Sequence, residues 1–347
     1  MREIIDKLVN RVNLTEKQMF EVMRAIMEGK MTSVQIAAII TALRIKGETV
    51  EEITGAVKAM RSKANTIKPL LEYYIDTCGT GGDGGHTFNV STASALVAAA
   101  GGVSVAKHGN RSVSSRCGSA DVLESLGVCI DLTADVVKQC IEKEKIGFMF
   151  APLFHPSMKY AAVPRKEMGI RTIFNILGPL TNPAMAKGQM LGVYDKALMH
   201  TLAKVLQNLG TERAMLVCGE DGLDEITLTT KTNVCELKDG EIYEYQIDPK
   251  VYGFDYCHLE DLTGGDAKEN ANIITDILSG RCKGPKTDMV ILNSAAALYI
   301  GKKANDLEEG IRMAEKIIEE GSGLQKLKVF ATHSQLLKKQ STKGVAV

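Results

Sequence analysis

Apolar residues recur at helical spacing through the first 68 residues of the chain. Three threonines each stand three positions before a Gln or Glu, the spacing of a capping box at a helix start: Thr15 with Gln18, Thr32 with Gln35, and Thr49 with Glu52. Behind the second box, apolar side chains repeat at i, i+3, i+4 and i+7 from Ile36 to Leu43. The segment therefore predicts a helical module, and no residue in it suggests chemistry.

From about residue 72 the pattern changes to short apolar runs that alternate with helical segments. The expected strands are 73–78, 103–107, 147–151, 191–194 and 213–218, and the expected helices are 92–101, 120–127, 134–145 and 196–209. Such alternation indicates an α/β fold with a mostly parallel central sheet flanked by helices. Around 226–248 the residues alternate and are rich in Thr, with Asp239-Gly240 as a turn, which predicts an antiparallel extension.

These patterns predict a small all-helical N-terminal domain over residues 1–70 and a large α/β domain over 71–347. Helices from about 158–185 are expected to join the helical domain. Amphipathic helices are expected at 266–280 and 307–320, and the polar, basic tail after about residue 334 is expected to fray.

Composition excludes several classes of protein. The 347 residues are 45% apolar, and 42 basic residues balance 42 acidic ones, so no broad basic field favours nucleic acid or an anionic membrane. No apolar run reaches the roughly 18–20 residues that cross a bilayer, and the charged first residues do not read as a signal peptide. Eight cysteines without a CxxC pair indicate free thiols in a reducing cytoplasm.

A glycine-rich run, Gly79-Thr80-Gly81-Gly82-Asp83, follows the first expected strand. Glycines there let backbone N–H groups approach an anion such as a phosphate, although many such turns only reverse the chain. Ser91 and Thr92 then stand at a helix start, where unpaired N–H groups and the helix dipole favour an anion. The alternative for Ser91 is a simple N-cap.

Two further turns with anion-binding chemistry follow within forty residues. Lys107-His108-Gly109-Asn110-Arg111 supplies a point charge and a guanidinium that could hold an anion in bidentate fashion, unless the pair is only a solvated face. A lone histidine is more often structural, but the place of His108 between Lys107 and Asn110 makes a structural and a binding role equally plausible. Gly118-Ser119 opens another helix. Each of these turns follows a strand, so we expect them to meet at one edge of the sheet.

An acidic run, Glu220 to Glu225, comes directly after an expected strand. Adjacent carboxylates suit Mg²⁺, which prefers oxygen ligands and shares them with phosphates; the alternative is an acidic loop without metal. A third group, 151–158 with Arg165, offers apolar walls and one cation, as a flat carboxylate ligand needs. The run 175–183 suggests a fixed inter-domain connection. Neither a nucleophile elbow nor a P-loop is present, so the motifs indicate pyrophosphate with a metal.

Four phrases in this order carry a family resemblance: GTGGDG-x-x-TFN-x-STAS, KHGNR-x-x-SS-x-x-GSADVLE, GIRTIFN-x-LGPLTNP and GEDGLDE. Over about residues 3 to 325 the chain resembles the anthranilate phosphoribosyltransferases of tryptophan biosynthesis. The resemblance implies a helical domain joined to an α/β domain, a fold similar to that of pyrimidine nucleoside phosphorylases. It also implies a homodimer that transfers the phosphoribosyl group of phosphoribosyl pyrophosphate to the amino nitrogen of anthranilate, with Mg²⁺, two ions in number.

The resemblance also assigns residues. It implies catalytic roles for Lys107 and Asp83, an anthranilate site at Gly79, Asn110, His155 and Arg165, and metal ligands at Ser91, Asp224 and Glu225. The residues expected to bind phosphoribosyl pyrophosphate are Gly79, Gly82, Asp83, Thr87, Asn89, Val90, Ser91, Thr92, Lys107, His108, Gly109, Asn110, Arg111, Ser115 and Ser119. The segment from Lys107 to Ser115 is expected to wrap the diphosphate.

Two other functions remain open at this point. A pyrimidine nucleoside phosphorylase would bind inorganic phosphate and would need no diphosphate or Mg²⁺ site, against which the Asp224/Glu225 pair and the KHGNR phrase argue. A non-catalytic nucleic-acid-binding relative would need a basic surface, against which the zero net charge argues.

Overall fold

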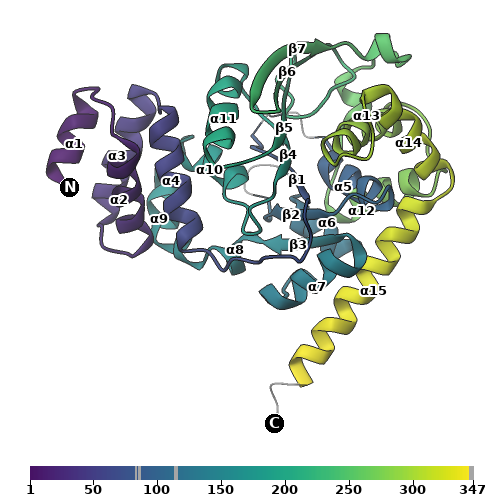
Figure 1. The fold of residues 1–347 in the computed structure, drawn as a ribbon, viewed down its shortest axis with the longest axis horizontal. Helices are drawn as coiled ribbons and strands as arrows, with labels where there is room; N and C mark the ends of the chain where they lie inside the picture. The colour runs from purple at the N-terminus through teal and green to yellow at the C-terminus, as the bar shows by residue number, and fades with distance from the viewer. Residues whose placement is uncertain (83, 85–86, 113–115, 344–347) are drawn as a thin grey trace.

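The computed structural model describes residues 1–82, 84, 87–112 and 116–343, with residues 342 and 343 described without their side chains. A layer of helices lies at one end, a sheet crosses the middle, and further helices cover the opposite face of the sheet (Figure 1). Among the described residues, none of the helices is both long and apolar enough to cross a membrane.

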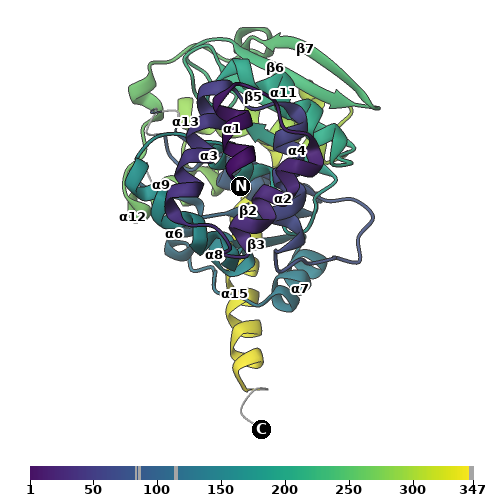
Figure 2. The same ribbon diagram turned by 90° about the vertical axis from the view of Figure 1, so that its left-hand side faces the viewer.

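The N-terminal layer consists of α1 (Arg2–Val9), α2 (Glu16–Met27), α3 (Ser33–Lys46) and α4 (Val50–Ser62). All three predicted capping boxes form, at Thr15, Thr32 and Thr49, so each helix begins where its threonine satisfies free N–H groups. The layer stands in front of the sheet in Figure 2.

Helices α9 (Lys159–Met168) and α10 (Phe174–Leu180) return to this layer from the middle of the chain. Helix α9 packs on α2 and α3, and α10 packs on α4. Ala161 and Leu177 are fully buried there, in an apolar cluster that also takes in α11 (Lys196–Asn208). One continuous core therefore joins the N-terminal helices to one face of the sheet.

In the part of the chain that the structure describes, seven strands form the sheet in the order β3-β2-β1-β4-β5-β6-β7. Their bounds are β1 Ile75–Gly79, β2 Val105–Gly109, β3 Ile146–Phe150, β4 Gly188–Gly192, β5 Arg213–Gly219, β6 Thr232–Lys238 and β7 Glu241–Ile247. The first five run parallel, and β6 and β7 add an antiparallel hairpin. The predicted fold class is confirmed.

The other face of the sheet carries the larger core. It is covered by α5 (Val90–Ala100), α6 (Ser119–Ser125), α7 (Ala134–Glu144), α12 (Ala267–Leu278), α13 (Pro285–Ile300), α14 (Leu307–Glu319) and α15 (Ser322–Lys343). Helix α13 is buried on all sides from Met289 to Ile300. Shorter helical turns complete the connections: α8 Ala151–Phe154, η1 Pro156–Met158, η2 Pro249–Tyr252 and η3 Leu259–Leu262.

Several expected boundaries are wrong by two or three residues, such as the start of β4, which lies at Gly188 and not at 191, and two of the differences are informative. Strand β2 does not stop at Lys107 but continues to Gly109, because these residues pair with β3 in register, Lys107 opposite Phe148 and His108 opposite Met149. The tail after residue 334 continues as helix α15 to Lys343, which extends outward from the body (Figure 1). Polar contacts hold this helix: Ser334 Oγ accepts from Cys129 N at 3.0 Å, and Lys338 Nζ donates to an Asp131 carboxylate oxygen at 2.7 Å.

Candidate active site

The glycine-rich turn leaves the carboxyl end of β1 and lies against the acidic run after β5. Gly81 and Gly82 have φ of 64° and 75°, a conformation that favours glycine. The Gly81 N–H donates to Asp224 Oδ2 at 2.7 Å. A Cβ on Gly79 would stand 2.3 Å from the same oxygen, so the absent side chain makes room for the carboxylate. The two motifs therefore meet, as expected from strand order.

The start of helix α5 meets the second acidic residue. Ser91 N donates to Glu225 Oε1 at 3.2 Å, and the Ser91 carbonyl accepts from Thr77 Oγ1 at 3.1 Å. The N-cap position belongs to Asn89, so the simple N-cap reading of Ser91 is wrong. Asn89 does not cap with its own side chain, which instead bonds the Cys117 carbonyl at 3.1 Å and Asn270 Nδ2 at 3.0 Å.

Lys107 reaches this same space from β2 although it is only 3% exposed. Its Nζ donates to the Thr77 carbonyl and lies 3.5 Å from Ser91 Oγ. No carboxylate oxygen of the described chain lies within ion-pair distance of it. Burial lowers the pKa of Lys107, and the negative charges of Asp76 and Glu225 oppose this. A buried ammonium held by neutral groups is well placed to receive an anionic ligand.

A buried carboxylate and amide fix β1 and β2 beneath the site. Asn182 Nδ2 donates to Asp76 Oδ2 at 2.7 Å and to the Ala106 carbonyl at 2.8 Å, while Asp76 Oδ1 accepts from His108 N at 3.2 Å. Burial raises the pKa of Asp76, against the opposing effect of Lys107. Sequence reasoning missed Asp76 and Asn182. An Asp inside an otherwise apolar strand was the available signal.

Two histidines lie side by side where β2 meets α8. The rings of His108 and His155 are 5.2 Å apart, and His155 Nε2 lies 3.0 Å from the Thr181 carbonyl, to which it must donate. Burial lowers the pKa of His108 to about 3 and of His155 to about 4, so both are neutral at pH 7. His108 Nε2 is buried without a hydrogen-bond partner among the described residues.

Two arginines lie on helix α9 and in the segment that follows it. Arg165, on α9, lies over the Phe174 ring at 5.1 Å and has no carboxylate partner in the part of the chain that the structure describes. Partial burial lowers its pKa, as expected for a cation without a counter-charge. Arg171 donates to the Gly82 carbonyl and lies 4.1 Å over the Tyr194 ring, so it supports the glycine turn. Arg171 was missed, although it stands in the GIRTIFN phrase.

The end of β2 and the start of α6 are held by hydrogen bonds within the protein. Arg111 Nη1 pairs with Asp121 at 2.8 Å and with Glu124 at 2.9 Å, which raises its pKa. Asn110 Oδ1 accepts from Arg111 N at 2.8 Å, and Ser119 Oγ lies 3.4 Å from the Asn110 carbonyl. In this structure Arg111 thus neutralises carboxylates of the chain itself.

The remaining site residues fall into three groups. Gly109 is as tightly placed as Gly79, since a Cβ on it would stand 2.1 Å from Ser119 Oγ. Thr87 forms an isolated bridge with Thr263, and Val90 and Thr92 are buried in α5. Asp83 and Ser115 lie outside the described residues.

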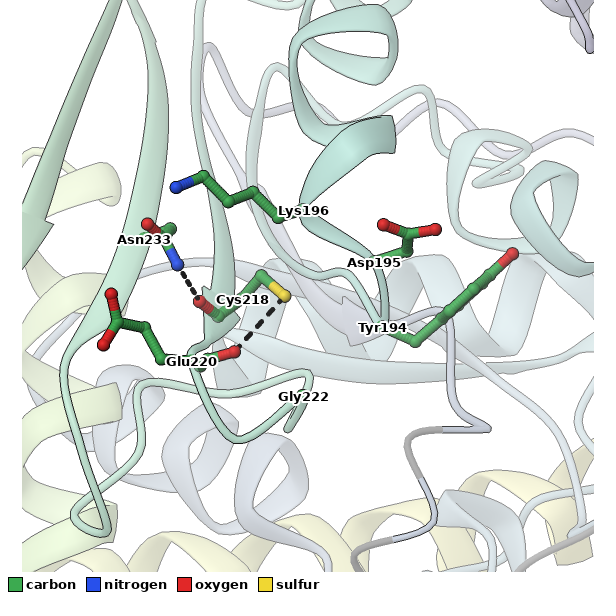
Figure 3. Close-up of a pocket in the computed structure, with 8 residues that line it drawn as sticks. Tyr194, Asp195, Lys196, Cys218, Glu220, Gly222 and Asn233 are labelled. Atoms are coloured by element: carbon green, nitrogen blue, oxygen red, sulfur yellow. Dashed lines mark hydrogen bonds between the residues drawn. The ribbon is translucent and has the colours of Figure 1, made fainter.

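A hollow of about 420 Å³ adjoins the acidic loop, at the carboxyl ends of β4 and β5 (Figure 3). It is lined by Tyr194, Asp195, Lys196, Cys218, Gly219, Glu220, Gly222 and Asn233. Tyr194 is the residue that also stacks on Arg171. The hollow is lined by Glu220 and Gly222 of the acidic run but by none of the residues assigned to a substrate or to the metal, so it is a neighbour of the candidate active site and not the site itself.

The donor set suits a hard divalent cation. Asp224 lies against Gly81 and Glu225 lies against the start of α5 at Ser91, so two carboxylates and the Ser91 hydroxyl offer the oxygen ligands that Mg²⁺ prefers. The space beside Gly79, which a Cβ would fill, is taken by Asp224. The residues present therefore fit Mg²⁺.

The fold combines a helical bundle with an α/β unit, and the comparisons with known proteins assign this combination to a class of glycosyl-transferring proteins. Two family models match: "Glycosyl transferase family, helical bundle domain" over residues 2–64 and "Glycosyl transferase family, a/b domain" over residues 71–324.

Individual relatives narrow the class. The anthranilate phosphoribosyltransferase of Acetivibrio thermocellus is 62% identical over 330 residues, 95% of each chain. The crystal structure of the Thermus thermophilus enzyme of that name is 40% identical with a TM-score of 0.91, covering 96% of this chain and 99% of that one. The Saccharomyces cerevisiae enzyme in complex with PRPP and Mg is 28% identical with a TM-score of 0.88, covering 96% and 97%. The chain belongs to the anthranilate phosphoribosyltransferase family, which confirms the predicted resemblance.

Proposed function

We propose that this chain transfers the phosphoribosyl group of 5-phosphoribosyl 1-pyrophosphate to the amino group of anthranilate, with release of pyrophosphate. The observation that carries the proposal is the meeting of three features at one sheet edge. These are the N–H groups of Gly81 and Ser91, the buried cation of Lys107, and the carboxylates of Asp224 and Glu225. A diphosphate ligand needs all three.

Phosphoribosyl pyrophosphate would bind between the glycine turn and α5. In this structure the N–H groups of Gly81 and Ser91 donate to the carboxylates of Asp224 and Glu225. A phosphate can take the place of these carboxylates as acceptor only if a cation then compensates the charge of the carboxylates. Mg²⁺ bound by Asp224, Glu225 and Ser91 would neutralise charge on the diphosphate. The count of two ions and the catalytic role of Asp83 rest on the family resemblance.

Anthranilate would bind beside the histidine pair. Arg165 has a guanidinium with no carboxylate partner among the described residues, and an aromatic carboxylate would provide that partner. His155 and His108 are neutral, so they present uncharged rings to the aromatic ring of the ligand. Asn110 and Gly79 complete the assignment that the resemblance implies.

The chain's own contribution to the reaction is mainly electrostatic. The C1–O bond to pyrophosphate breaks, its electron pair leaves with the pyrophosphate, and the amino nitrogen bonds to C1 and gives up a proton to water. Lys107 would stabilise the departing charge from a buried position, where an ion interacts more strongly than in water. An aromatic amine is neutral at pH 7 and needs no strong base, in keeping with histidines whose pKa values are far below 7.

The assembly belongs to the proposal as well. A helical domain of residues 1–70 with the helices of 158–185, an α/β domain of 71–347, a cytoplasmic location and a homodimer through the helical domain all remain inferences. The dimer is supported by apolar side chains that are exposed on and around α1 and α3: Val9, Val12, Val34 and Ile45. Light scattering on the purified chain would test it.

The test of function is the loss of anthranilate fluorescence when the chain is mixed with anthranilate, phosphoribosyl pyrophosphate and Mg²⁺. We expect a decay that EDTA abolishes and excess Mg²⁺ restores. Parallel samples contain thymidine or uridine with phosphate, and single-stranded DNA at several salt concentrations. Phosphorolysis or salt-dependent DNA binding by folded protein, without the decay, would replace the proposal with one of the two alternatives.

A further inference from the structure

A second group of metal-ligating side chains lies on β6, β7 and α11, and it shares no residue with the candidate active site. His200, Cys235 and Glu244 each offer one ligand atom, and these atoms all lie within 4.8 Å of one another. The elements that carry them adjoin in both views of the molecule (Figures 1 and 2).

Regular structure fixes this arrangement. Cys235 on β6 is directly opposite Glu244 on β7 in the antiparallel register, so both side chains lie on the same face of the sheet. Helix α11 covers that face, as the burial of Cys235 and Leu237 with Ala203 and Leu206 shows. His200 Nδ1 then lies 2.7 Å from Glu244 Oε1. Cross-strand pairing and helix packing thus bring the three groups together.

The ligand chemistry selects the cation. A thiolate, an imidazole and a carboxylate together are typical of Zn²⁺, which accepts sulfur, nitrogen and oxygen and takes a fourth ligand from water. Mg²⁺ binds oxygen and does not suit a set containing sulfur. The side chains of His200 and Glu244 are 51% and 62% exposed, whereas Cys235 is 1% exposed. A cation can therefore enter between the exposed ligands and meet the sulfur beneath them.

The free energy needed to deprotonate Cys235 opposes the binding of a metal. Burial, with a smaller effect from Glu244, raises the pKa of the Cys235 thiol to about 12, so the proton must leave when a metal binds. Zinc binding to cysteine always releases this proton, and a preformed cluster loses little further entropy on binding. The alternative to a metal site is that His200 and Glu244 only pair with each other at the surface, above a buried thiol that binds no metal. The experiment must distinguish this alternative from a metal site.

We propose that His200, Cys235 and Glu244 form a Zn²⁺ site that fastens α11 to the β6–β7 hairpin. The site is independent of the Mg²⁺ ligands of the transferase reaction, because the two sites differ in ligand chemistry and share no residue. Bound Zn²⁺ would link three elements across the antiparallel edge of the sheet, and so would stabilise the folded state by mass action.

Cobalt is the probe, because a Co²⁺–thiolate bond gives a charge-transfer absorption that oxygen ligands do not give. We expect the full chain to take up Co²⁺ with a band of one thiolate per chain, which added Zn²⁺ removes. The band should be absent in Cys235→Ser and retained in the matched control Cys140→Ser, a buried thiol on α7. A band that survives in Cys235→Ser, or no band in the wild-type chain, would overturn the proposal.

The exposed ligands give a second test that does not disturb the core. His200→Ala should weaken Zn²⁺ binding by about 100-fold or more, since the loss of an outer-shell partner alone costs about 10–100-fold. Zn²⁺ should raise the Tm of the wild-type chain and of Cys140→Ser, but not of His200→Ala or Glu244→Gln. An equal rise in Tm for His200→Ala would show that zinc binds elsewhere. Neither variant touches the transferase site, so a failure here leaves the proposed function standing.

Discussion

Two buried lysines show how differently the helical layer and the sheet edge are built. In the helical layer, Lys46 Nζ donates to Glu52 Oε2 at 2.8 Å, to Asn13 Oδ1 at 2.9 Å and to the Gly47 carbonyl at 2.6 Å. The side chains of the ion pair are 4% and 0% exposed. Every partner lies within one local cluster, so the charge of Lys46 is compensated inside the protein.

At the sheet edge, Lys107 is equally buried but has only a carbonyl and a hydroxyl within hydrogen-bond distance of its Nζ in the described chain. Its nearest negative influences, Asp76 and Glu225, act at longer range. A buried charge without a partner costs stability, and proteins keep such charges where a ligand provides the partner. The first lysine therefore serves folding, and we expect the second to serve binding.

The largest effect is expected from breaking the compensated pair. Lys46→Met leaves Glu52 buried without its cation, and the loss of one partner from a buried pair costs about 3–5 kcal/mol of unfolding free energy. Urea denaturation measures this loss. The control Lys58→Met removes an exposed ion pair to Glu16, with side chains 43% exposed, and should change stability by less than about 1 kcal/mol. A small loss in Lys46→Met would mean that its charge is not what holds the layer.

Lys107→Met should have the opposite effects, with stability kept and activity lost. It removes an uncompensated buried charge, so stability should hold or rise, while kcat/KM should fall by about 10²–10³, the usual cost of losing one electrostatic donor at a reacting centre. Steady-state kinetics and urea denaturation of the same preparation check both parts. Lys46→Met, assayed under conditions where it is folded, should keep its kcat. If Lys107→Met were instead strongly destabilised, its charge would be structural and the contrast between the two lysines would fail.

The sequence predicts the two regions with unequal success, and the reason is the range of their contacts. Capping boxes act over three residues, so Thr15, Thr32 and Thr49 were placed correctly from the sequence. The order of strands and helices also follows from local periodicity. Parallel strands then bring their carboxyl ends together, which is why the convergence of the glycine and acidic motifs could be foreseen.

The contacts that shape the site join residues far apart in the chain. Ser91 and Glu225 are 134 positions apart, and Asp76 and Asn182 are 106 apart. No local pattern reports such pairs, so Asn182 was assigned only to an inter-domain connection. The same limit explains helix α15: its expected fraying ignored Cys129 and Asp131, more than 200 positions away, which hold it by hydrogen bonds.

Acid should destabilise the region around the sheet edge and not the N-terminal helical layer. All six histidines of the chain lie beyond residue 70, and His155 has its pKa lowered by burial from 6.5 to about 4. The unfolded chain therefore binds a proton that the folded chain excludes between these values. The resulting stability is present above about pH 6.5 and is lost as the pH falls toward 4, by up to about 3 kcal/mol at about 1.4 kcal/mol for each pKa unit.

Thermal unfolding between pH 7.5 and 4.5 measures this loss, and His155→Gln is the informative variant. Glutamine can still donate to the Thr181 carbonyl but does not titrate, so the variant should show a flatter dependence of Tm on pH than the wild-type chain. His258→Gln, at an exposed position, is the matched control and should leave the slope unchanged. Equal slopes for all three proteins would show that His155 is not the group that acid attacks.

The smallest effect is expected at the edge of the site, where a cation is only partly buried. Arg165→Ala should raise the KM for anthranilate by about 10–100-fold, since a charge-assisted hydrogen bond contributes about 1.5–3 kcal/mol, while the KM for phosphoribosyl pyrophosphate and the Tm stay nearly constant. Arg165→Lys keeps the charge without the planar fork and should recover only part of the loss. The neighbour Lys166→Ala, exposed on the same helix, controls for a general change in charge. Equal rises in both KM values would mean that Arg165 stabilises the structure around α9 and does not bind anthranilate specifically. A rise for anthranilate alone would make Arg165 a second cation, after Lys107, whose missing partner is a substrate.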